Sequence, residues 1–291
     1  MIRDALRRWR SRDTGILILL YHRVARLATD RWSIAVSPEH FAEHMELLRR
    51  RTTISRLADL DATRSWRRRW SGSVIVTFDD GYADNLSEAL PTLRRHDVPA
   101  TIFVVTDAVL GEREFWWDEL QRLVPREAYD ERWAELRDAD PAVREERLMV
   151  LRARAGQGDA PRDAGRPLTR DELAKLSADA LIDVGGHTAS HPRLAALPAA
   201  AQRREVEDGK RVLESIVGAR VTSFAYPFGR TADYTAETMQ IVRDAGFSRA
   251  CSNQTGRIDR STDPFALPRF FVRDWDGDQF AAALRDHGVR I

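Results

Sequence analysis

Two short stretches of this sequence combine carboxylate and imidazole side chains in a pattern that suits metal chemistry. Residues 77–81 (TFDDG) place two aspartates after an apolar run, and residues 187–192 (HTASHP) place two histidines four residues apart. A catalytic zinc ion usually takes three protein ligands from His and Asp/Glu and keeps one position open. Two carboxylates and two imidazoles supply three such ligands and leave one carboxylate as a general base. The inventory therefore predicts a metal-assisted hydrolase.

Neither stretch is decisive alone, because Asp-Asp-Gly after a strand is also typical of a turn. His40 and His44 repeat the four-residue spacing on an expected helix. The zinc-protease helix requires Glu directly after its first histidine, and Phe41 stands there instead. We interpret His40 and His44 as surface residues that flank a core stripe, and the combination of the two other stretches as the metal site.

The elements that must position these residues alternate between short β-branched runs and amphipathic stretches. Helices are expected from the capping Ser37 and Pro38 onward and near 83–96, 198–217, 235–245 and 277–286. This order predicts a mostly parallel sheet. The expected strands are 16–21, 73–78, 100–105, 181–185, 221–226, 246–251 and 266–272.

The unusual residues favour a sheet that closes into a barrel. His22, Asp79, His187 and Tyr226 each come just after a different expected strand. A β/α barrel gathers its site at the carboxyl ends of its strands, whereas an open doubly wound sheet gathers ligands at one crevice. We therefore predict a single barrel domain over residues 1–291, interrupted at 111–168 by a charged, helix-rich insertion that forms a lid or side-subdomain.

Composition excludes several classes of protein. The chain has 291 residues, with 46 basic against 45 acidic side chains, so no overall field attracts nucleic acid. The single cysteine, Cys251, excludes an internal disulfide framework. These features predict a cytoplasmic protein. Residues 1–12 could form a basic amphipathic helix on a membrane surface, or a terminal helix packed on the domain.

The motifs resemble those of the polysaccharide deacetylase family, also called carbohydrate esterase family four. Residues 77–81 match its TFDDG motif, residues 187–192 its H-(S/T)-x-x-H-P motif, and residues 224–229 (FAYPFG), with Tyr226, look like its third motif. The resemblance spans about residues 15–110 and 168–275. It implies a distorted (β/α)7 TIM-like barrel in which Asp79 is the general base. It also implies an oxyanion-binding N–H on Phe228 and three metal ligands, Asp80, His187 and His191.

Two departures from the family pattern concern the groups around the base. The third motif lacks the arginine that steadies the base, and Arg269 is the candidate replacement. The family's last motif, Leu-x-His, is missing near the C-terminus, but residues 20–22 (LYH) have that form. This order resembles the circularly permuted members, which include poly-N-acetylglucosamine deacetylases, and implies that His22 is the general acid.

The resemblance implies removal of an N-acetyl group from an amino sugar, with zinc as the default metal and cobalt or nickel also accepted. A cytoplasmic enzyme would meet this sugar on a lipid-linked or nucleotide-linked intermediate of surface-polysaccharide assembly. Trp116 and Trp117 could stack on the sugar or pack inside the insertion. The alternatives are a deformylase or cyclic imide or ureide hydrolase on the same site, and a catalytically silent carbohydrate-binding module.

Overall fold

The computed structural model describes residues 15–60, 72–111, 113–156, 165–259 and 261–291. The possible helix over residues 1–12 lies outside these ranges. Within them, no helix has both the length and the apolar character needed to cross a membrane.

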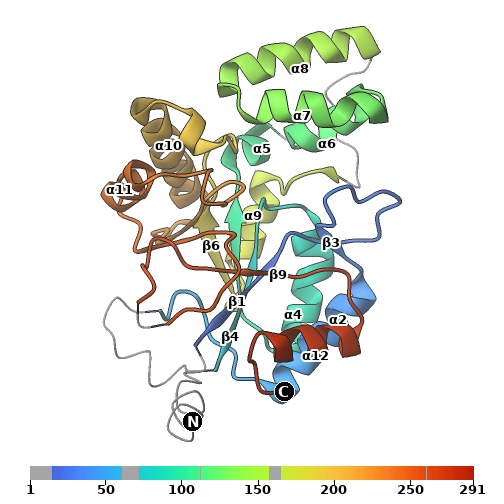
Figure 1. Cartoon of the computed structure of the whole chain (residues 1–291), viewed down its shortest axis with the longest axis vertical. Coiled ribbons are helices and arrows are strands. Elements are labelled where there is room, and N and C mark those ends of the chain that lie inside the picture. The colour runs from blue at the N-terminus through green and yellow to red at the C-terminus, as the bar shows by residue number, and fades with distance from the viewer. Residues whose placement is uncertain (1–14, 61–71, 112, 157–164, 260) are drawn as a thin grey trace, which may run out of the picture.

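All seven runs expected as strands join one parallel sheet, in the order β8-β7-β6-β5-β4-β1-β9 (Figure 1). The two strands of sequence LILLY and VIVTF are wholly buried, as is typical of parallel strands that are covered on both faces. A separate parallel pair is formed by two very short strands, β2 (Arg23–Val24) and β3 (Ala35–Val36). The strands of the main sheet are β1 (Leu17–Tyr21), β4 (Val74–Phe78), β5 (Ala100–Val104), β6 (Ile182–Gly186), β7 (Ser223–Ala225), β8 (Arg249–Cys251) and β9 (Phe270–Phe271).

The sheet is so strongly curled that one short segment pairs both with β8, at one end of the strand order, and with β1, near the other end. Leu267 forms a parallel bridge with Cys251 of β8, while Phe270, three residues later, pairs with Leu19 of β1. The run that contains β9 therefore lies between the first and the last of the other strands. This arrangement confirms the distorted (β/α)7 architecture.

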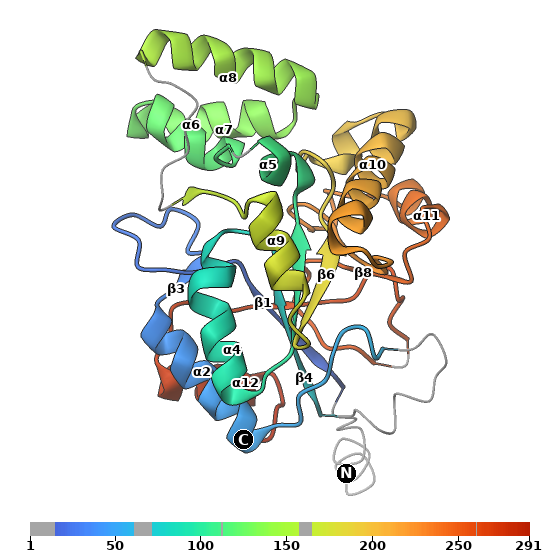
Figure 2. The same cartoon turned by 180° about the vertical axis from the view of Figure 1, so that it is seen from behind.

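Helices pack around the outside of the curled sheet, and those expected from the sequence are confirmed. Ser37 accepts a hydrogen bond from the His40 N–H at the start of α2, and the stretch 83–96 begins as a π-helical turn. Figure 2 shows α2, α4 and α9 over one side of the sheet and α10 and α11 over the adjoining side. These outer elements are α2 (Pro38–Arg51), η1 (Asn85–Ala89), α4 (Leu90–His96), α5 (Thr106–Gly111), α9 (Arg170–Ser177), η4 (Leu194–Ala196), α10 (Ala199–Val217), α11 (Ala236–Asp244) and α12 (Gly277–Asp286).

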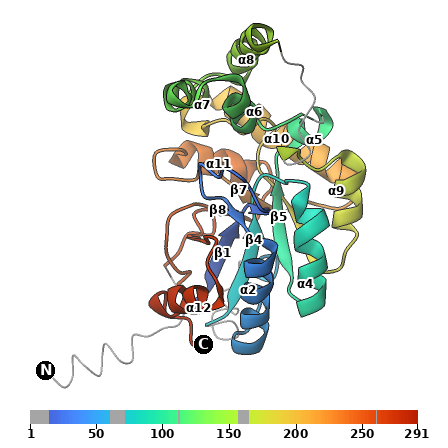
Figure 3. The same ribbon diagram turned by 90° about the vertical axis from the view of Figure 1, so that its right-hand side faces the viewer.

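A separate group of helices stands beyond the carboxyl ends of the strands, inside the stretch predicted as an insertion (Figures 1 and 3). We call this group the cap; it consists of α6 (Trp116–Leu123), η2 (Arg126–Ala128), α7 (Tyr129–Arg137) and α8 (Pro141–Ala155). The cap has its own apolar cluster, which includes Phe115 and Tyr129, and Tyr82 from the loop after β4 packs into it. The cap is thus anchored to the loop that carries the aspartate pair.

Candidate active site

The predicted site residues meet at the carboxyl ends of the strands, on loops with unusual backbone geometry. Asp80, His191 and Phe228 have φ values of 74°, 57° and 61°, in the left-handed region that side chains with a Cβ rarely adopt. Such conformations persist only where the surroundings enforce them, and they concentrate at functional sites. Three left-handed residues at one site therefore indicate that its loops are held in a fixed shape.

Asp80, His187 and His191 form a compact group of buried donor atoms. The Asp80 Oδ1 atom is 3.5 Å from His187 Nε2 and 3.6 Å from His191 Nε2, and the three donors lie within 4.8 Å of one another. A tetrahedral ion with bonds of about 2.0–2.1 Å needs ligand atoms roughly 3.3–3.5 Å apart. The group therefore fits a divalent metal ion. One carboxylate and two imidazoles suit zinc, cobalt or nickel.

The protonation of both imidazoles suits the same role. His187 Nδ1 lies 2.8 Å from the carbonyl oxygen of Ala225, which can only accept, so Nδ1 carries the hydrogen and Nε2 is free to bind. Burial lowers the pKa of His191 well below its usual value and keeps it neutral. Burial also lowers the pKa of His187, but the carboxylates of Asp79 and Asp80 outweigh it and the net shift is upward. The raised pKa favours a second proton, on Nε2 of His187, and a metal ion must displace this proton when it binds.

Asp79, the carboxylate outside the group of three candidate ligands, forms a bidentate ion pair with a buried arginine. Arg269 donates from Nη1 and Nη2 to the two carboxylate oxygens at 2.6 and 2.7 Å. The guanidinium is itself fixed by bonds to the carbonyl of Ser252 and the side chain of Asn253. Burial raises the pKa of Asp79, but the charge of Arg269 outweighs it and the net shift is downward. Arg269 thus holds the carboxylate of Asp79 in a fixed orientation.

His22 and Phe228 complete the same pocket. The side-chain amide of Asn85, from the π-helical turn, donates to the carbonyl of His22 at 2.9 Å and holds the end of β1. Burial lowers the pKa of His22, whose ring packs 5.2 Å from that of Phe271. In the described part of the chain, no acceptor pairs with the Phe228 N–H, which leaves it available to an anionic oxygen.

The pocket has a volume of about 290 Å³ and contains only one of the two tryptophans proposed to contact substrate. Trp117 lines it, with its ring 4.5 Å from that of His191. Trp116 lies behind, under the guanidinium of Arg144, so the packing alternative applies to it. Tyr226 was expected at the site, but this is wrong for its side chain, which is buried in the core and donates to the carbonyl of Phe265.

Several pocket residues carry no motif that the sequence analysis detected. Asn253 and Phe271 sit at or just after strand ends, so the rule that found His22 could also have found them. The others come from the β2–β3 loop, the cap and the loops after β7 and β9, which no periodic pattern connects. The missed lining residues are Trp32, Ile34, Trp133, Arg137, Arg230, Asp233, Asn253, Phe271 and Arg273.

The loop that carries His191 is clamped from both sides by charged side chains. Arg144 of α8 donates to the carbonyl oxygens of Ser190 at 2.5 Å and His191 at 3.4 Å. Glu205 of α10 accepts from the backbone N–H groups of Ala189 and Ser190 at 3.1 and 2.9 Å. Through one buried arginine, the cap therefore contacts the loop that carries His191, a candidate metal ligand.

Replacing Arg144 with methionine should weaken metal binding by about 10- to 100-fold, the usual effect of losing an outer partner of a ligand. The carbonyl oxygens beside His191 would lose their donor, and its imidazole would lose its fixed orientation. Competition against a chromogenic chelator measures the affinity. Arg144→Lys should recover part of it, and Arg147→Met, on the same helix but paired with Glu135 at the surface, should match the wild type. Equal affinity in Arg144→Met and wild type would contradict the clamp.

Comparisons with known proteins agree with this geometry. A family model described as polysaccharide deacetylase matches residues 68–250, more than half of the chain. The match includes the aspartate pair and both histidine ligands, but neither His22 nor Arg269. A curated relative, YxkH of Bacillus subtilis (strain 168), whose name carries the same family term, is 22% identical over 271 residues, covering 92% of this chain and 75% of its own.

Solved structures share the fold at low identity. The deacetylase PplD of Streptococcus pyogenes, in complex with acetate, has a TM-score of 0.62 at 18% identity and covers 92% of this chain and 97% of its own. IcaB from Ammonifex degensii has a TM-score of 0.60 at 21% identity, with 92% and 96% covered. The BpsB deacetylase domain from Bordetella bronchiseptica has a TM-score of 0.61 at 16% identity, with 89% and 96% covered. Fold and family match together assign this chain to the polysaccharide deacetylase family of hydrolases.

Proposed function

We propose that this hydrolase removes the N-acetyl group from an amino sugar in a metal-dependent reaction. The observation that carries the proposal is an ionised carboxylate, Asp79, fixed by Arg269 next to the ligand group of Asp80, His187 and His191. A site that only bound sugar would have no need of this spare, oriented base. Two of the structural relatives, PplD and the BpsB domain, are named as deacetylases, which supports acetyl as the acyl group.

Each residue has a distinct part in amide hydrolysis. The chemistry that a divalent ion held by the ligand group would supply is activation of water and polarisation of the acetyl carbonyl. Asp79 accepts the proton of the attacking water, and Arg269 keeps its carboxylate aligned. The Phe228 N–H donates to the oxyanion that forms at the former carbonyl. His22, in its protonated imidazolium form, delivers a proton to the departing amine, so that the sugar leaves as a neutral amine.

We further propose that the enzyme acts in the cytoplasm, on a lipid-linked or nucleotide-linked intermediate of surface-polysaccharide assembly. The basic and apolar composition of residues 1–12, which lie outside the described ranges, supports contact with the membrane that would carry a lipid-linked sugar. Zinc is the metal we favour, because the two imidazoles and one carboxylate match its usual catalytic ligands.

A substrate panel tests the proposed reaction. Purified protein loaded with zinc should release acetate from at least one N-acetylated amino sugar, and a chelator should abolish the release until zinc, cobalt or nickel is returned. Enzymatic acetate detection measures the rate, and formate detection runs beside it. Formate from N-formyl sugars, with no acetate from any acetylated one, would favour the deformylase alternative. Sugar binding without any acyl release would favour the binding module.

A further inference from the structure

Two arginines line the active-site pocket without an acidic partner among the described residues. Arg273 lies 4.1 Å over the ring of Phe271 and donates to the carbonyl oxygens of Trp32 and Ser33 at 3.1 and 3.0 Å. Its guanidinium is therefore held in place but its charge is not neutralised. Arg230 is exposed, and the described part of the chain gives its side chain no hydrogen-bond or ion-pair partner.

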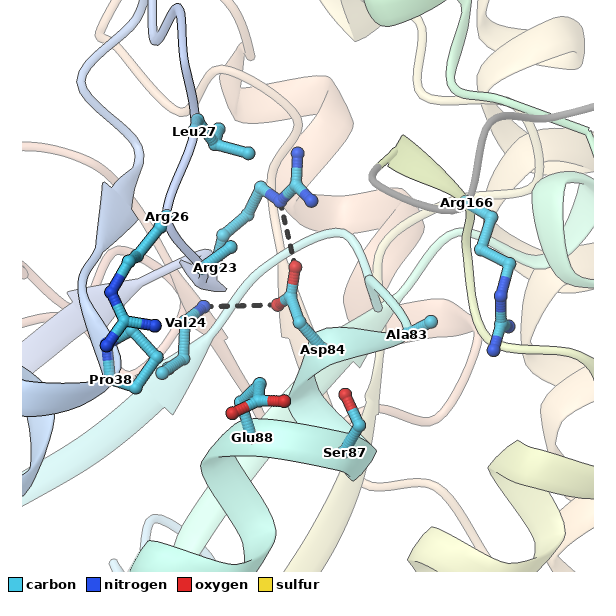
Figure 4. A pocket seen from close by; sticks show the side chains of 11 residues that line it. Arg23, Val24, Arg26, Leu27, Pro38, Ala83, Asp84, Ser87, Glu88 and Arg166 are labelled. Carbon is cyan, nitrogen blue, oxygen red and sulfur yellow. Dashed lines mark hydrogen bonds and ion pairs between the residues drawn. The ribbon is translucent and has the colours of Figure 1, made fainter.

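Another cavity of the same protein, in which Figure 4 shows Arg23 bonded to Asp84, has the opposite arrangement. This cavity, of about 420 Å³, is lined by Arg23, Arg26 and Arg166. Each of these arginines has a carboxylate partner: Asp84 for Arg23 at 2.9 Å, Glu39 for Arg26, and Glu172 for Arg166 at 2.6 Å. Its cationic groups are neutralised within the protein. Arg230 and Arg273 thus differ from the arginines of a comparable cavity in keeping their charge available.

The remaining charges of the active-site pocket do not cancel these two. The charge of Asp79 is offset by Arg269, and a divalent ion would more than offset Asp80. Asp233 keeps its negative charge while it accepts from the backbone N–H of Arg230, so it offsets at most one of the two arginines. Arg137 also lines the pocket, and it is paired with Asp138. The loaded pocket would therefore be positive, and it would concentrate anions.

An aromatic wall stands in the same pocket, where the β2–β3 loop meets the cap. The rings of Trp32 and Trp133 lie 4.7 Å apart, and the Trp32 indole donates to the Tyr129 hydroxyl. Arg31 strengthens the junction by pairing with Asp130 at 2.8 Å. Among the described residues, Trp32 is one of the few large apolar ones left exposed, at 37%. A rigid, partly exposed indole offers its face to a flat apolar surface such as that of a sugar ring.

We propose that this pocket selects an N-acetylated amino sugar that carries an anionic group, phosphoryl or carboxylate, beside the acetamido ring. Arg230 and Arg273 bind the anionic oxygens, because guanidinium groups pair with phosphate and carboxylate through two parallel hydrogen bonds. Trp32 and Trp133 form the wall against which the sugar packs. This inference rests on the proposed function for the position of the acetamido group, and it adds the residues that recognise an anionic group beside that ring.

The test compares acetate release from charged and neutral substrates. The panel contains N-acetylglucosamine 1-phosphate, UDP-N-acetylglucosamine, an N-acetylglucosamine–glucuronate disaccharide and the neutral di-N-acetylchitobiose. Wild type should favour an anionic member over the neutral one by about tenfold or more in kcat/KM, the effect of one charge-assisted hydrogen bond. The preferred anion, phosphoryl or carboxylate, identifies the group. The preference should shrink as salt screens the arginines.

Variants assign the preference to the two arginines. Arg230→Gln and Arg273→Gln should each lower kcat/KM for the anionic substrate about tenfold more than for the neutral one. Arg211→Gln, which removes a paired arginine from the outer face of α10, should keep the wild-type preference. Equal kcat/KM for charged and neutral substrates in wild type would overturn the inference.

A binding measurement separates this inference from the proposed function. Quenching of tryptophan fluorescence reports binding of N-acetylglucosamine 1-phosphate and of N-acetylglucosamine without any turnover. Tighter binding of the phosphate, lost in Arg230→Gln, would support the inference even if no substrate released acetate. Acetate release with equal binding of both sugars would leave the proposed function standing and reject the anionic substrate.

Discussion

Replacing Asp79 with asparagine should lower kcat by roughly 10²–10⁴ and leave the metal content of the protein unchanged, because it removes a general base and no ligand. The amide has nearly the shape of the carboxylate and can still accept from Arg269, but it cannot take a proton from water. Acetate release under saturating substrate measures kcat, and metal analysis of the same sample measures occupancy. Turnover near the wild-type rate would reject Asp79 as the base.

Asp79→Asn also breaks a buried ion pair with Arg269, so it lowers stability as well as removing the base. A second variant separates the two effects. Breaking a buried pair by removing one charge costs about 3–5 kcal/mol of stability, because the other charge stays buried alone. Asp79→Asn should therefore lower the free energy of unfolding. The double variant Asp79→Asn/Arg269→Gln removes both charges, and it should recover stability without recovering turnover. Recovery of both would mean that Asp79→Asn acts through folding alone.

A matched control comes from another buried arginine pair. Asp84→Asn removes the negative charge that pairs with Arg23, which lies outside the active-site pocket and is similarly buried. This variant should lose stability while the acetate-releasing activity of its folded fraction stays close to that of the wild type. Comparing the two asparagine variants at equal folded fraction separates the chemistry of Asp79 from the general cost of neutralising the carboxylate beside a buried arginine.

The strands could be predicted from the sequence, because a buried parallel strand is a short continuous run of apolar residues. The run at 74–78 is apolar, β-branched and followed at once by two aspartates, so its identity and its carboxyl end are both visible. The site follows from the same fact, since a barrel brings every strand end to one rim. His22 could be placed beside Asp79 for this reason, although the two are far apart in sequence.

Strand ends alone did not predict to which side of the sheet a side chain points. Phe224 and Tyr226 are two residues apart and so point to the same side, and in the structure both lie in the core with their rings 5.4 Å apart. Parallel strands are apolar on both sides, so the sequence alone could not assign Tyr226 to the core. Arg269, by contrast, left a usable signal. It is the one charged residue in the apolar run 265–272 (FALPRFFV), and a buried guanidinium requires a carboxylate partner.

The aromatic wall and the clamp could not be predicted, because they depend on contacts between distant segments. Trp32 meets Trp133 about a hundred residues along the chain, and Arg144 reaches a loop that follows it by 46 residues. Neither contact follows from periodicity or capping, which report only local structure. The docking of the cap on the barrel determines both, and the sequence indicated only that residues 111–168 were too long for a simple connection.

Replacing His191 with alanine should remove both the bound metal and the activity, since the ion would keep only two of its three protein ligands. Wild type purified without chelator should contain about one equivalent of zinc, cobalt or nickel per chain. Metal analysis by mass spectrometry measures the content, and this result does not depend on knowing the substrate. Wild type that stays empty after all three metals are supplied would reject the hydrolytic mechanism.

The backbone at His191 calls for a second variant. Its φ of 57° disfavours alanine, so His191→Ala could act through the shape of the loop as well as through the lost ligand. Asparagine tolerates the left-handed region, and its amide is a poor ligand for zinc. His191→Asn should therefore lose metal while keeping the wild-type melting temperature measured without metal. His40→Ala, which removes a partly exposed histidine paired with Asp274, should keep its metal. Metal retained in His191→Asn would show that this imidazole shapes the loop and does not bind the ion.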